Sequence, residues 1–217
     1  MQNEKPQCNL PKRMEVLPLD TRGYPIPFFV GRNETGEIDF RVMDLEKRTR
    51  AIKQKLCFVC GDHLGINVTF IGGPMIGVNR TSAEPPNHYE CARWSAMNCP
   101  FLANPKMVRR EDELINNASM VDQAPGMATT RNPGVTMLWI TRHFECFDDG
   151  RGSYLIQMGN PERVEWYAEG KPANHHQVMT SVRSGLPSLY AVAERQEGSM
   201  KLLSEMLEQF LAYVPAV

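Results

Sequence analysis

The sequence predicts an α+β fold made of antiparallel strands, a small cysteine-containing module and C-terminal helices. Three observations lead to this prediction. Two residue pairs of the kind that bind metals, Cys57/Cys60 and His88/Cys91, flank a segment in which apolar and polar residues alternate. Short runs rich in β-branched and aromatic residues recur between turn residues over much of the chain. The last fifth of the chain carries helical patterns with capping residues.

The most informative motif is Cys57-Phe-Val-Cys60, which is followed about 27 residues later by His88-Tyr-Glu-Cys91. A Cys-x-x-Cys turn offers two thiolates to one ion, and His-x-x-Cys at the start of a helix places imidazole and sulfur on one helical face. This spacing predicts a tetrahedral structural zinc (Zn2+) site. Four protein ligands leave no open position for a substrate, so the site is expected to stabilise the fold. Cys99, roughly two helical turns after Cys91, is an alternative ligand in place of His88.

The composition is that of an ordinary globular chain, with 217 residues, 42% hydrophobic, 23% charged and a net charge of −1. This balance gives no overall attraction to nucleic acid or to an anionic membrane. The sequence contains no apolar run near the ~20 residues of a membrane span, and its N-terminus lacks the apolar core of a signal peptide. We therefore expect no membrane partner and a cytoplasmic location. In that reducing compartment Cys8 and Cys146 are expected to be free thiols.

Four sequence regions are expected to form one continuous globular unit. Residues 1–20 contain prolines without periodicity and predict an extended lead-in that docks on the domain or stays mobile. Residues 21–103 are expected to hold a hairpin and the zinc module, and residues 134–217 an antiparallel meander and helices. Between them, residues 104–133 are polar and irregular. A segment of that length without periodicity is typically a functional loop or a linker.

In the N-terminal part, the sequence predicts a hairpin of strands 24–30 and 37–42, followed by a helix over 45–56 with Asp44 as its N-cap. The basic side of this helix, with Arg80, forms the candidate nucleic-acid-binding set. Its members are Lys47, Arg50, Lys53 and Arg80. The alternative is that these charges only solvate the helix surface, as charges on amphipathic helices usually do.

Between the ligand pairs, Ile66–Ile71 and Met75–Val78 predict a second hairpin across Gly72-Gly-Pro74. Asn87 is expected to cap a helix over 88–98 that carries the second ligand pair. The order of a Cys-x-x-Cys turn, a hairpin and a helix resembles a treble-clef zinc module over residues 57–99. Treble clefs occur in structural, nucleic-acid-binding and nuclease proteins, so this resemblance bears on fold more than on function.

The C-terminal part predicts a three-stranded meander over 136–141, 153–158 and 163–168. Three helices should follow, and they are expected over 174–184, 187–197 and 199–213. The last of these helices has a broad apolar stripe. This stripe is expected to pack on the sheet, and the alternative is a homo-oligomer formed through this C-terminal helix.

Several longer motifs run through nearly the whole chain. They are Arg22-Gly-Tyr-Pro-Ile-Pro, Asp39-Phe-Arg, Cys57-Phe-Val-Cys-Gly, Asn79-Arg-Thr-Ser-Ala-Glu-Pro-Pro, His88-x-x-Cys91-Ala, Cys99-Pro-Phe-Leu and Ser184-Gly-Leu-Pro. In these motifs the chain resembles an uncharacterised family of small zinc-binding proteins found in bacteria and their phages. The resemblance implies a prokaryotic or phage protein in the bacterial cytoplasm, and it implies no activity.

Two classes of function follow from these features. The first is a non-enzymatic, zinc-stabilised binding protein that acts on nucleic acid or on a protein, such as a host factor if the chain is phage-encoded. The alternative is a metal-dependent hydrolase or nuclease whose site lies beside the zinc module and uses Asp62, His63, Arg80 and Glu84. HNH-type nucleases need a general-base histidine on the hairpin, and residues 66–79 contain none.

Overall fold

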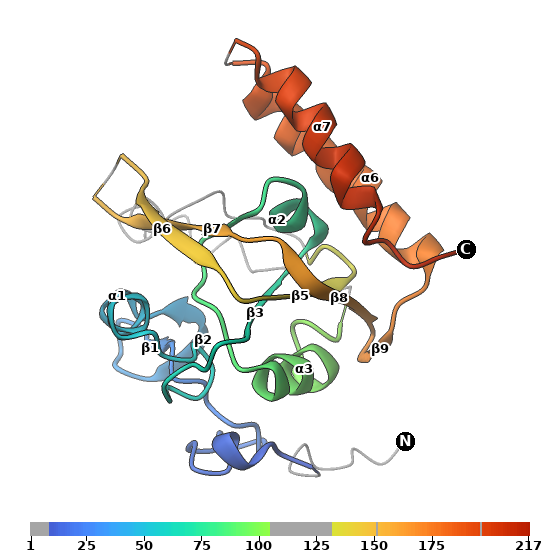
Figure 1. The fold of residues 1–217 in the computed structure, drawn as a ribbon. Helices are drawn as coiled ribbons and strands as arrows, with labels where there is room; N and C mark the ends of the chain where they lie inside the picture. Colours follow the sequence, from blue (N-terminus) through green and yellow to red (C-terminus); the bar gives the residue numbers. More distant parts are fainter. Residues whose placement is uncertain (1–8, 105–131, 151, 196) are drawn as a thin grey trace.

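Strand β5 (Thr136–Thr141) lies at the centre of the fold, and all six of its residues are buried. It pairs antiparallel with β3 (Val68–Gly72) on one side and with β8 (Pro161–Ala168) on the other. The short strand β9 (Lys171–Pro172) completes a four-stranded sheet of order β3-β5-β8-β9 (Figure 1). The structure is a computed structural model that describes residues 9–104, 132–150, 152–195 and 197–217. The predicted α+β class is confirmed.

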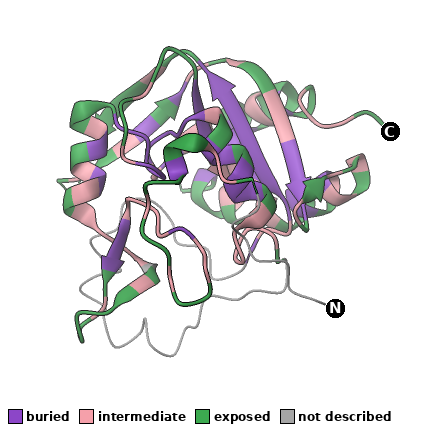
Figure 2. Cartoon of the chain, turned by 90° about the horizontal axis from the view of Figure 1, so that it is seen from below, coloured by how far each residue is buried: buried purple, intermediate pink, exposed green. Residues whose placement is uncertain are grey.

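The two faces of β5 belong to two different hydrophobic cores. Met137 and Trp139 point into the larger core, which is shared with the C-terminal helices, and Leu138 and Ile140 point into a smaller core under helix α3 (Tyr89–Asn98). Successive side chains alternate between the faces of a strand, so a strand covered on both faces is apolar at consecutive positions. Figure 2 shows buried strands, in purple, at the centre of the chain.

Helices α6 (His175–Ala193) and α7 (Ser199–Leu211) cover the larger core. The predicted break at Gly185 and Pro187 is wrong, because α6 continues through both residues. Proline removes one helical donor, but α6 packs along α2 (Pro74–Val78) and α7, and a Cβ at Gly185 would lie 2.7 Å from Met75 Cγ. Tertiary packing therefore overrides the local helix-breaking signal.

The apolar stripe of α7 packs as expected, with Leu203 and Phe210 buried in the larger core. Leu202 and Leu211, which belong to the same stripe, are 57% and 41% exposed. Self-association through this helix stays a prediction. None of the helices in the described ranges is long and apolar enough to cross a membrane.

A second sheet contains β4 (Thr81–Ser82), β7 (Tyr154–Met158) and β6 (Phe144–Asp148) in the order β4-β7-β6. The predicted meander is therefore wrong in its pairing. The strand at 154–158 does not lie between the strands at 136–141 and 161–168, which pair directly with each other. The strand at 154–158 pairs instead with β6, and the two form a hairpin. Strand β6 itself was not predicted from the sequence.

Strands β1 (Val30–Arg32) and β2 (Ile38–Met43) form the predicted N-terminal hairpin, although the first strand begins later than expected. Pro25 and Pro27 lack the N–H groups that a longer strand would need. Helix α1 (Leu45–Gln54) follows, with the predicted N-cap, since the Asp44 side chain accepts a hydrogen bond from the backbone N–H of Lys47. The left-handed Lys55 (φ 52°) ends α1 and leads directly into the first cysteine pair.

The predicted hairpin between the two ligand pairs does not form. Met75–Val78 belongs to helix α2, with Pro74 at its first turn, and β3 pairs with the distant β5. A short apolar run fits a buried helix as well as a strand, and here the helix packs between β5 and the C-terminal helices. The treble-clef resemblance is therefore not confirmed.

The described part of the lead-in, residues 9–20, docks on the domain. It contains a short 3-10 helix, η1 (Lys12–Met14), and Met14 is only 1% exposed. Most of the predicted irregular loop 104–133 lies outside the described residues. The division into sequence regions stays a prediction.

Candidate metal centre

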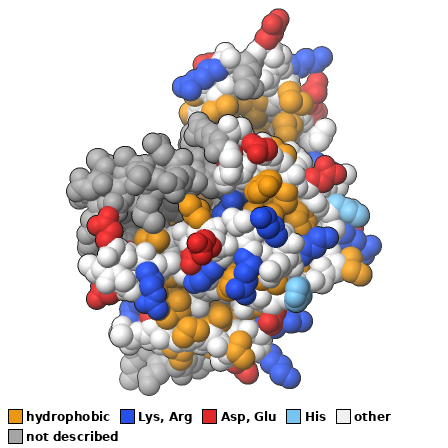
Figure 3. Space-filling view, turned by 90° about the vertical axis from the view of Figure 1, so that its left-hand side faces the viewer, with side chains coloured by type: hydrophobic (Ala, Val, Ile, Leu, Met, Phe, Trp, Pro, Cys, Tyr) orange, Lys and Arg blue, Asp and Glu red, His pale blue; other side chains and the backbone are white. Residues whose placement is uncertain are grey.

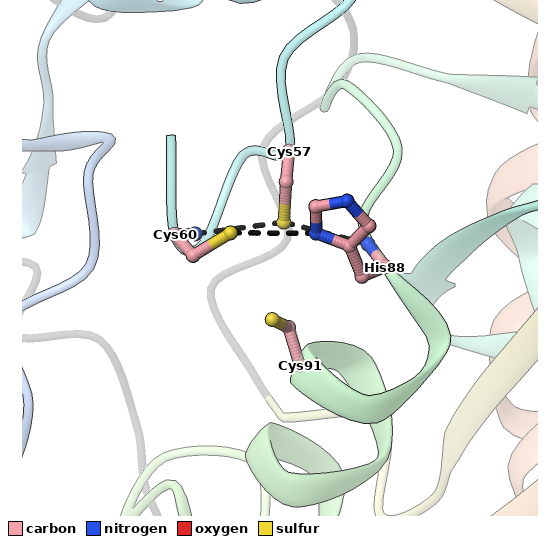
Figure 4. A group of neighbouring side chains, drawn as sticks. All are labelled: Cys57, Cys60, His88 and Cys91. Atoms are coloured by element: carbon pink, nitrogen blue, oxygen red, sulfur yellow. Dashed lines mark hydrogen bonds between the residues drawn. The ribbon is translucent and has the colours of Figure 1, made fainter. Parts of the chain in front are cut away.

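Cys57, Cys60, His88 and Cys91 converge on one point from two separate segments of the chain (Figure 4). All four residues are buried, and their donor atoms all lie within 4.8 Å of one another. Three sulfur atoms and one ring nitrogen therefore surround a space of the size that a single tetrahedral ion occupies.

The loop after α1 forms the first half of the site. The backbone N–H of Cys57 donates to the Asp62 carbonyl (2.7 Å), and the N–H of Gly61 donates to the Cys57 carbonyl (2.8 Å). These bonds fold Cys60 back onto Cys57. Gly61 has φ +80°, and a Cβ there would lie 2.9 Å from the Phe28 ring, so the turn requires glycine at this position.

Two backbone N–H groups point at the sulfur of Cys57. The N–H of Cys60 lies 3.5 Å from Cys57 Sγ, and the N–H of His88 lies 3.4 Å from it. Such contacts stabilise a thiolate, which is the form of cysteine that binds metal. The second of these bonds also joins the two halves of the site directly.

His88 stands at the N-cap of α3, so Cys91 lies in the first turn of the helix beside it. Its Nε2 lies 3.0 Å from the backbone carbonyl of His63, and its Nδ1 lies 3.3 Å from Cys60 Sγ. A carbonyl can only accept, so Nε2 carries the hydrogen, and in a neutral ring Nδ1 then has the free lone pair. The tautomer is therefore the one that binds a metal through Nδ1, oriented by a carbonyl behind the ring.

Asn87 was predicted as the helix cap, but His88 takes that position and the Asn87 side chain hydrogen-bonds the cysteine loop instead. Its Oδ1 accepts from the backbone N–H of Val59 (3.0 Å) and lies 3.9 Å from Cys57 Sγ. Its Nδ2 donates to the Thr69 carbonyl (3.4 Å). Asn87 therefore connects the cysteine loop to strand β3, a role that its position beside a ligand could have suggested.

The cysteine thiols of the cluster differ in how readily they ionise. Burial acts to raise the pKa of Cys57, but the side chains of Cys60 and Cys91 and the N–H groups of Cys60 and His88 lower that pKa to about 3. Hydrogen bonds with Cys57 and Cys60, together with burial, raise the pKa of Cys91. Contact with Cys60 raises the pKa of His88, against the opposing effect of burial. Without a cation, one thiolate therefore disfavours the next, whereas a divalent ion favours the thiolate form of all three.

The N-terminal lead-in covers this site. Met14 packs in one cluster with the three cysteines and Trp94. Arg13 places its guanidinium 3.1 Å from Glu90 on α3 and 3.5 Å from Asp62 in the cysteine loop. Residues 12–14 have no periodic signal in the sequence, so their contact with the site could not be predicted.

Cys99 is not part of the cluster. It caps the C-terminal end of α3, where its backbone N–H donates to the Ser95 carbonyl (2.9 Å), and burial raises the pKa of its thiol. In the described ranges, the only group of three or more residues that could hold a metal consists of Cys57, Cys60, His88 and Cys91. This is the set that the spacing predicted, and the alternative set with Cys99 instead of His88 does not form.

The candidate nucleic-acid-binding residues fall into two separate neighbourhoods. Lys47 and Arg50 lie on α1 over the ring of Phe28, and Lys53 is exposed one turn further along. Arg80 instead lies over the Trp139 ring and hydrogen-bonds Asn160. The structure therefore supports a local cationic face on α1 that does not include Arg80.

The residues of the alternative enzyme site are also divided. Asp62 pairs with Arg13, and the His63 carbonyl supports His88, so both belong to the surroundings of the metal centre. Arg80 contacts Asn160 and, at 3.5 Å, Gln209 of α7. These contacts favour structural roles for the three residues over a shared catalytic site.

No protein-family model, curated protein or solved structure matches the chain. The resemblance to small proteins of bacteria and their phages stays a prediction. The feature of the described chain with recognisable chemistry is the buried group of Cys57, Cys60, His88 and Cys91, which could hold a metal ion.

Proposed function

We propose that the chain is a non-enzymatic binding protein whose fold is stabilised by one zinc ion bound to Cys57, Cys60, His88 and Cys91. The observation that carries this proposal is the geometry of the four donors, which are buried and lie within 4.8 Å of one another. The tautomer of His88 with its hydrogen on Nε2, supported by the His63 carbonyl, leaves Nδ1 free to bind a metal.

The donor chemistry favours zinc. Three thiolates and one imidazole form a soft, tetrahedral set that suits Zn2+ in a structural site, whereas Mg2+ and Ca2+ prefer oxygen ligands. With all four positions taken by protein, the ion has no place for a water or substrate molecule. Its effect is on folding, because the free energy of binding the ion adds to the stability of the folded chain.

The ion would join the cysteine loop to the start of α3, the two segments that supply its four ligands. The cysteine loop follows α1, the second ligand pair begins α3, and the lead-in packs over both. Fixing the cysteine loop also fixes Phe28, whose backbone N–H donates to the Val59 carbonyl (2.7 Å). The surface around α1 is thus organised by the metal centre, and it is the surface we propose for a partner, either nucleic acid or protein.

The metal content of the purified protein and of two matched cysteine variants tests the proposal. Elemental analysis should find about one zinc per chain in the native protein and in Cys99→Ala, and almost none in Cys60→Ala. A strong chelator should unfold the module, seen as a loss of near-ultraviolet circular dichroism. Native protein without zinc, or loss of zinc in Cys99→Ala but not in Cys60→Ala, would show that the proposed ligand set is wrong.

A further inference from the structure

Exposed cations lie over aromatic rings on one face of the molecule, which we call the α1 face. It consists of residues 20–28, strand β2 and helix α1. Arg22 lies over the rings of Tyr24 (5.4 Å) and Phe40 (5.7 Å). Arg50 and Lys47 lie over the ring of Phe28, at 5.2 and 6.0 Å. Each of these aromatic groups therefore combines a flat ring with an adjacent positive charge.

The group formed by Arg22, Tyr24 and Phe40 is held in place before any partner binds. Asp20 accepts hydrogen bonds from Arg22 Nε (2.8 Å) and from the backbone N–H groups of Arg22 (2.9 Å) and Tyr24 (2.8 Å). Both oxygens of this carboxylate are thus used inside the turn. The Arg22 side chain remains 59% exposed and Phe40 remains 38% exposed, so the outer side of the group faces solvent.

Local charge on this face differs from the net charge of the chain. Residues 45–55 contain five basic residues, Lys47, Arg48, Arg50, Lys53 and Lys55, and one acidic residue, Glu46. Of the five, only Arg48 turns inward, and it is 2% exposed. Figure 3 shows Lys and Arg side chains, with hydrophobic ones between them, gathered on the side of the molecule where α1 lies in Figure 1. Helix α1 is therefore locally cationic although the chain carries a net charge of −1, and the rest of the α1 face adds Arg22 and Arg41 against Asp20 and Asp39.

We infer that the α1 face binds single-stranded nucleic acid, with unpaired bases stacking at Phe40 and beside Phe28 and with phosphates near Arg50 and Lys53. Aromatic rings offer stacking surfaces only to unpaired bases, and the cations attract the backbone phosphates. Tyr24 and Phe28 are four residues apart, which limits the separation of their Cα atoms to about 14 Å, and Arg22 contacts the rings of both Tyr24 and Phe40. One short strand can therefore contact both groups. This inference rests on the proposed function, since the zinc-bound cysteine loop positions Phe28.

Binding of a fluorescein-labelled oligothymidylate to the zinc-loaded, full-length protein, followed by fluorescence anisotropy, tests the inference. The single strand should bind more tightly than a duplex of the same length. The affinity for the single strand should fall as the salt concentration rises. A plot of the logarithm of the association constant against the logarithm of the salt concentration should have a slope of about −0.7 for each phosphate contacted. Phe40→Ala should weaken binding about tenfold through the loss of one stacked base. The triple variant Lys47→Glu, Arg50→Glu and Lys53→Glu should weaken binding and flatten the salt dependence.

The matched control is Phe147→Ala on β6, because Phe147 is 41% exposed and lies in the second sheet. It should bind the single strand as well as the native protein does. Equal binding of duplex and single strand, or an equal effect of the two phenylalanine variants, would overturn the inference. So would a zinc-loaded, folded protein that binds no nucleic acid, and that result would leave the zinc proposal intact and favour a protein partner. Measuring zinc in every sample separates failure of this inference from failure of the metal site.

Discussion

Replacing Arg48 by methionine should destabilise the protein strongly, although Arg48 is not one of the candidate metal ligands. Arg48 lies on α1 but is 2% exposed. Its guanidinium donates to the backbone carbonyl of Ala83 (2.8 Å), to Ser153 Oγ (3.3 Å) and to the carbonyl of Tyr154. These bonds attach α1 to the sheet of β4 and β7. Methionine keeps the apolar part of the side chain and removes the donors together with their positive charge.

The magnitude follows from the carbonyl groups that lose their donor. A hydrogen bond from a charged group contributes about 1.5 to 3 kcal/mol, and the partly buried carbonyls of Ala83 and Tyr154 place each bond at the low end of that range. We therefore expect Arg48→Met to lower the free energy of unfolding by about 3 kcal/mol. With a urea dependence of about 3 kcal/mol per molar, the unfolding midpoint should fall by about 1 M.

Urea unfolding followed by tryptophan fluorescence, in saturating zinc, measures this change. Lys53→Met is the matched control, because Lys53 lies on the same helix and is exposed. It should change the free energy of unfolding by less than about 0.5 kcal/mol. If Arg48→Met is no more destabilising than Lys53→Met, the inward position of Arg48 is wrong.

Two further substitutions test the core and the surroundings of the metal. Gly77→Ala would place a Cβ 2.6 Å from the Phe210 ring and should lower the free energy of unfolding by about 1 to 3 kcal/mol, measured by thermal unfolding. In the control Gly65→Ala the new Cβ meets nothing within 4 Å, so stability should not fall. Equal effects of the two substitutions would contradict the packing of α2. Asn87→Ala removes the acceptor beside the thiolates and should lower zinc affinity about 10- to 100-fold in chelator competition. The exposed control Asn67→Ala should leave it unchanged, and unchanged affinity in Asn87→Ala would exclude the role assigned to this side chain.

Local signals in the sequence predicted the elements that depend on local chemistry. Asp44 begins α1 as its spacing predicts, and Asn174 begins α6 with both hydrogen bonds of a capping box. The four residues of the buried Cys/His cluster were also found from spacing alone, because each pair lies within a single turn of the backbone.

Features that depend on distant partners could not be predicted. The pairing of β5 with β3 and β8 joins segments whose separation in sequence is large, and no local pattern distinguishes it from a meander. The run Met75–Val78 becomes a helix because it packs against α6 and α7. In the same way, the contact of Arg13 with Asp62 and Glu90 appears only when the lead-in docks on the folded domain.

X-ray absorption at the zinc K-edge of the native protein tests the central claim most directly. The buried cluster predicts one zinc with three sulfur ligands at about 2.3 Å and one nitrogen ligand at about 2.0 Å. A zinc with four sulfur ligands would mean that another cysteine binds in place of His88, which would contradict the position of His88 in the cluster. Oxygen ligands, or a purified native protein without zinc, would contradict the closed Cys3His site itself.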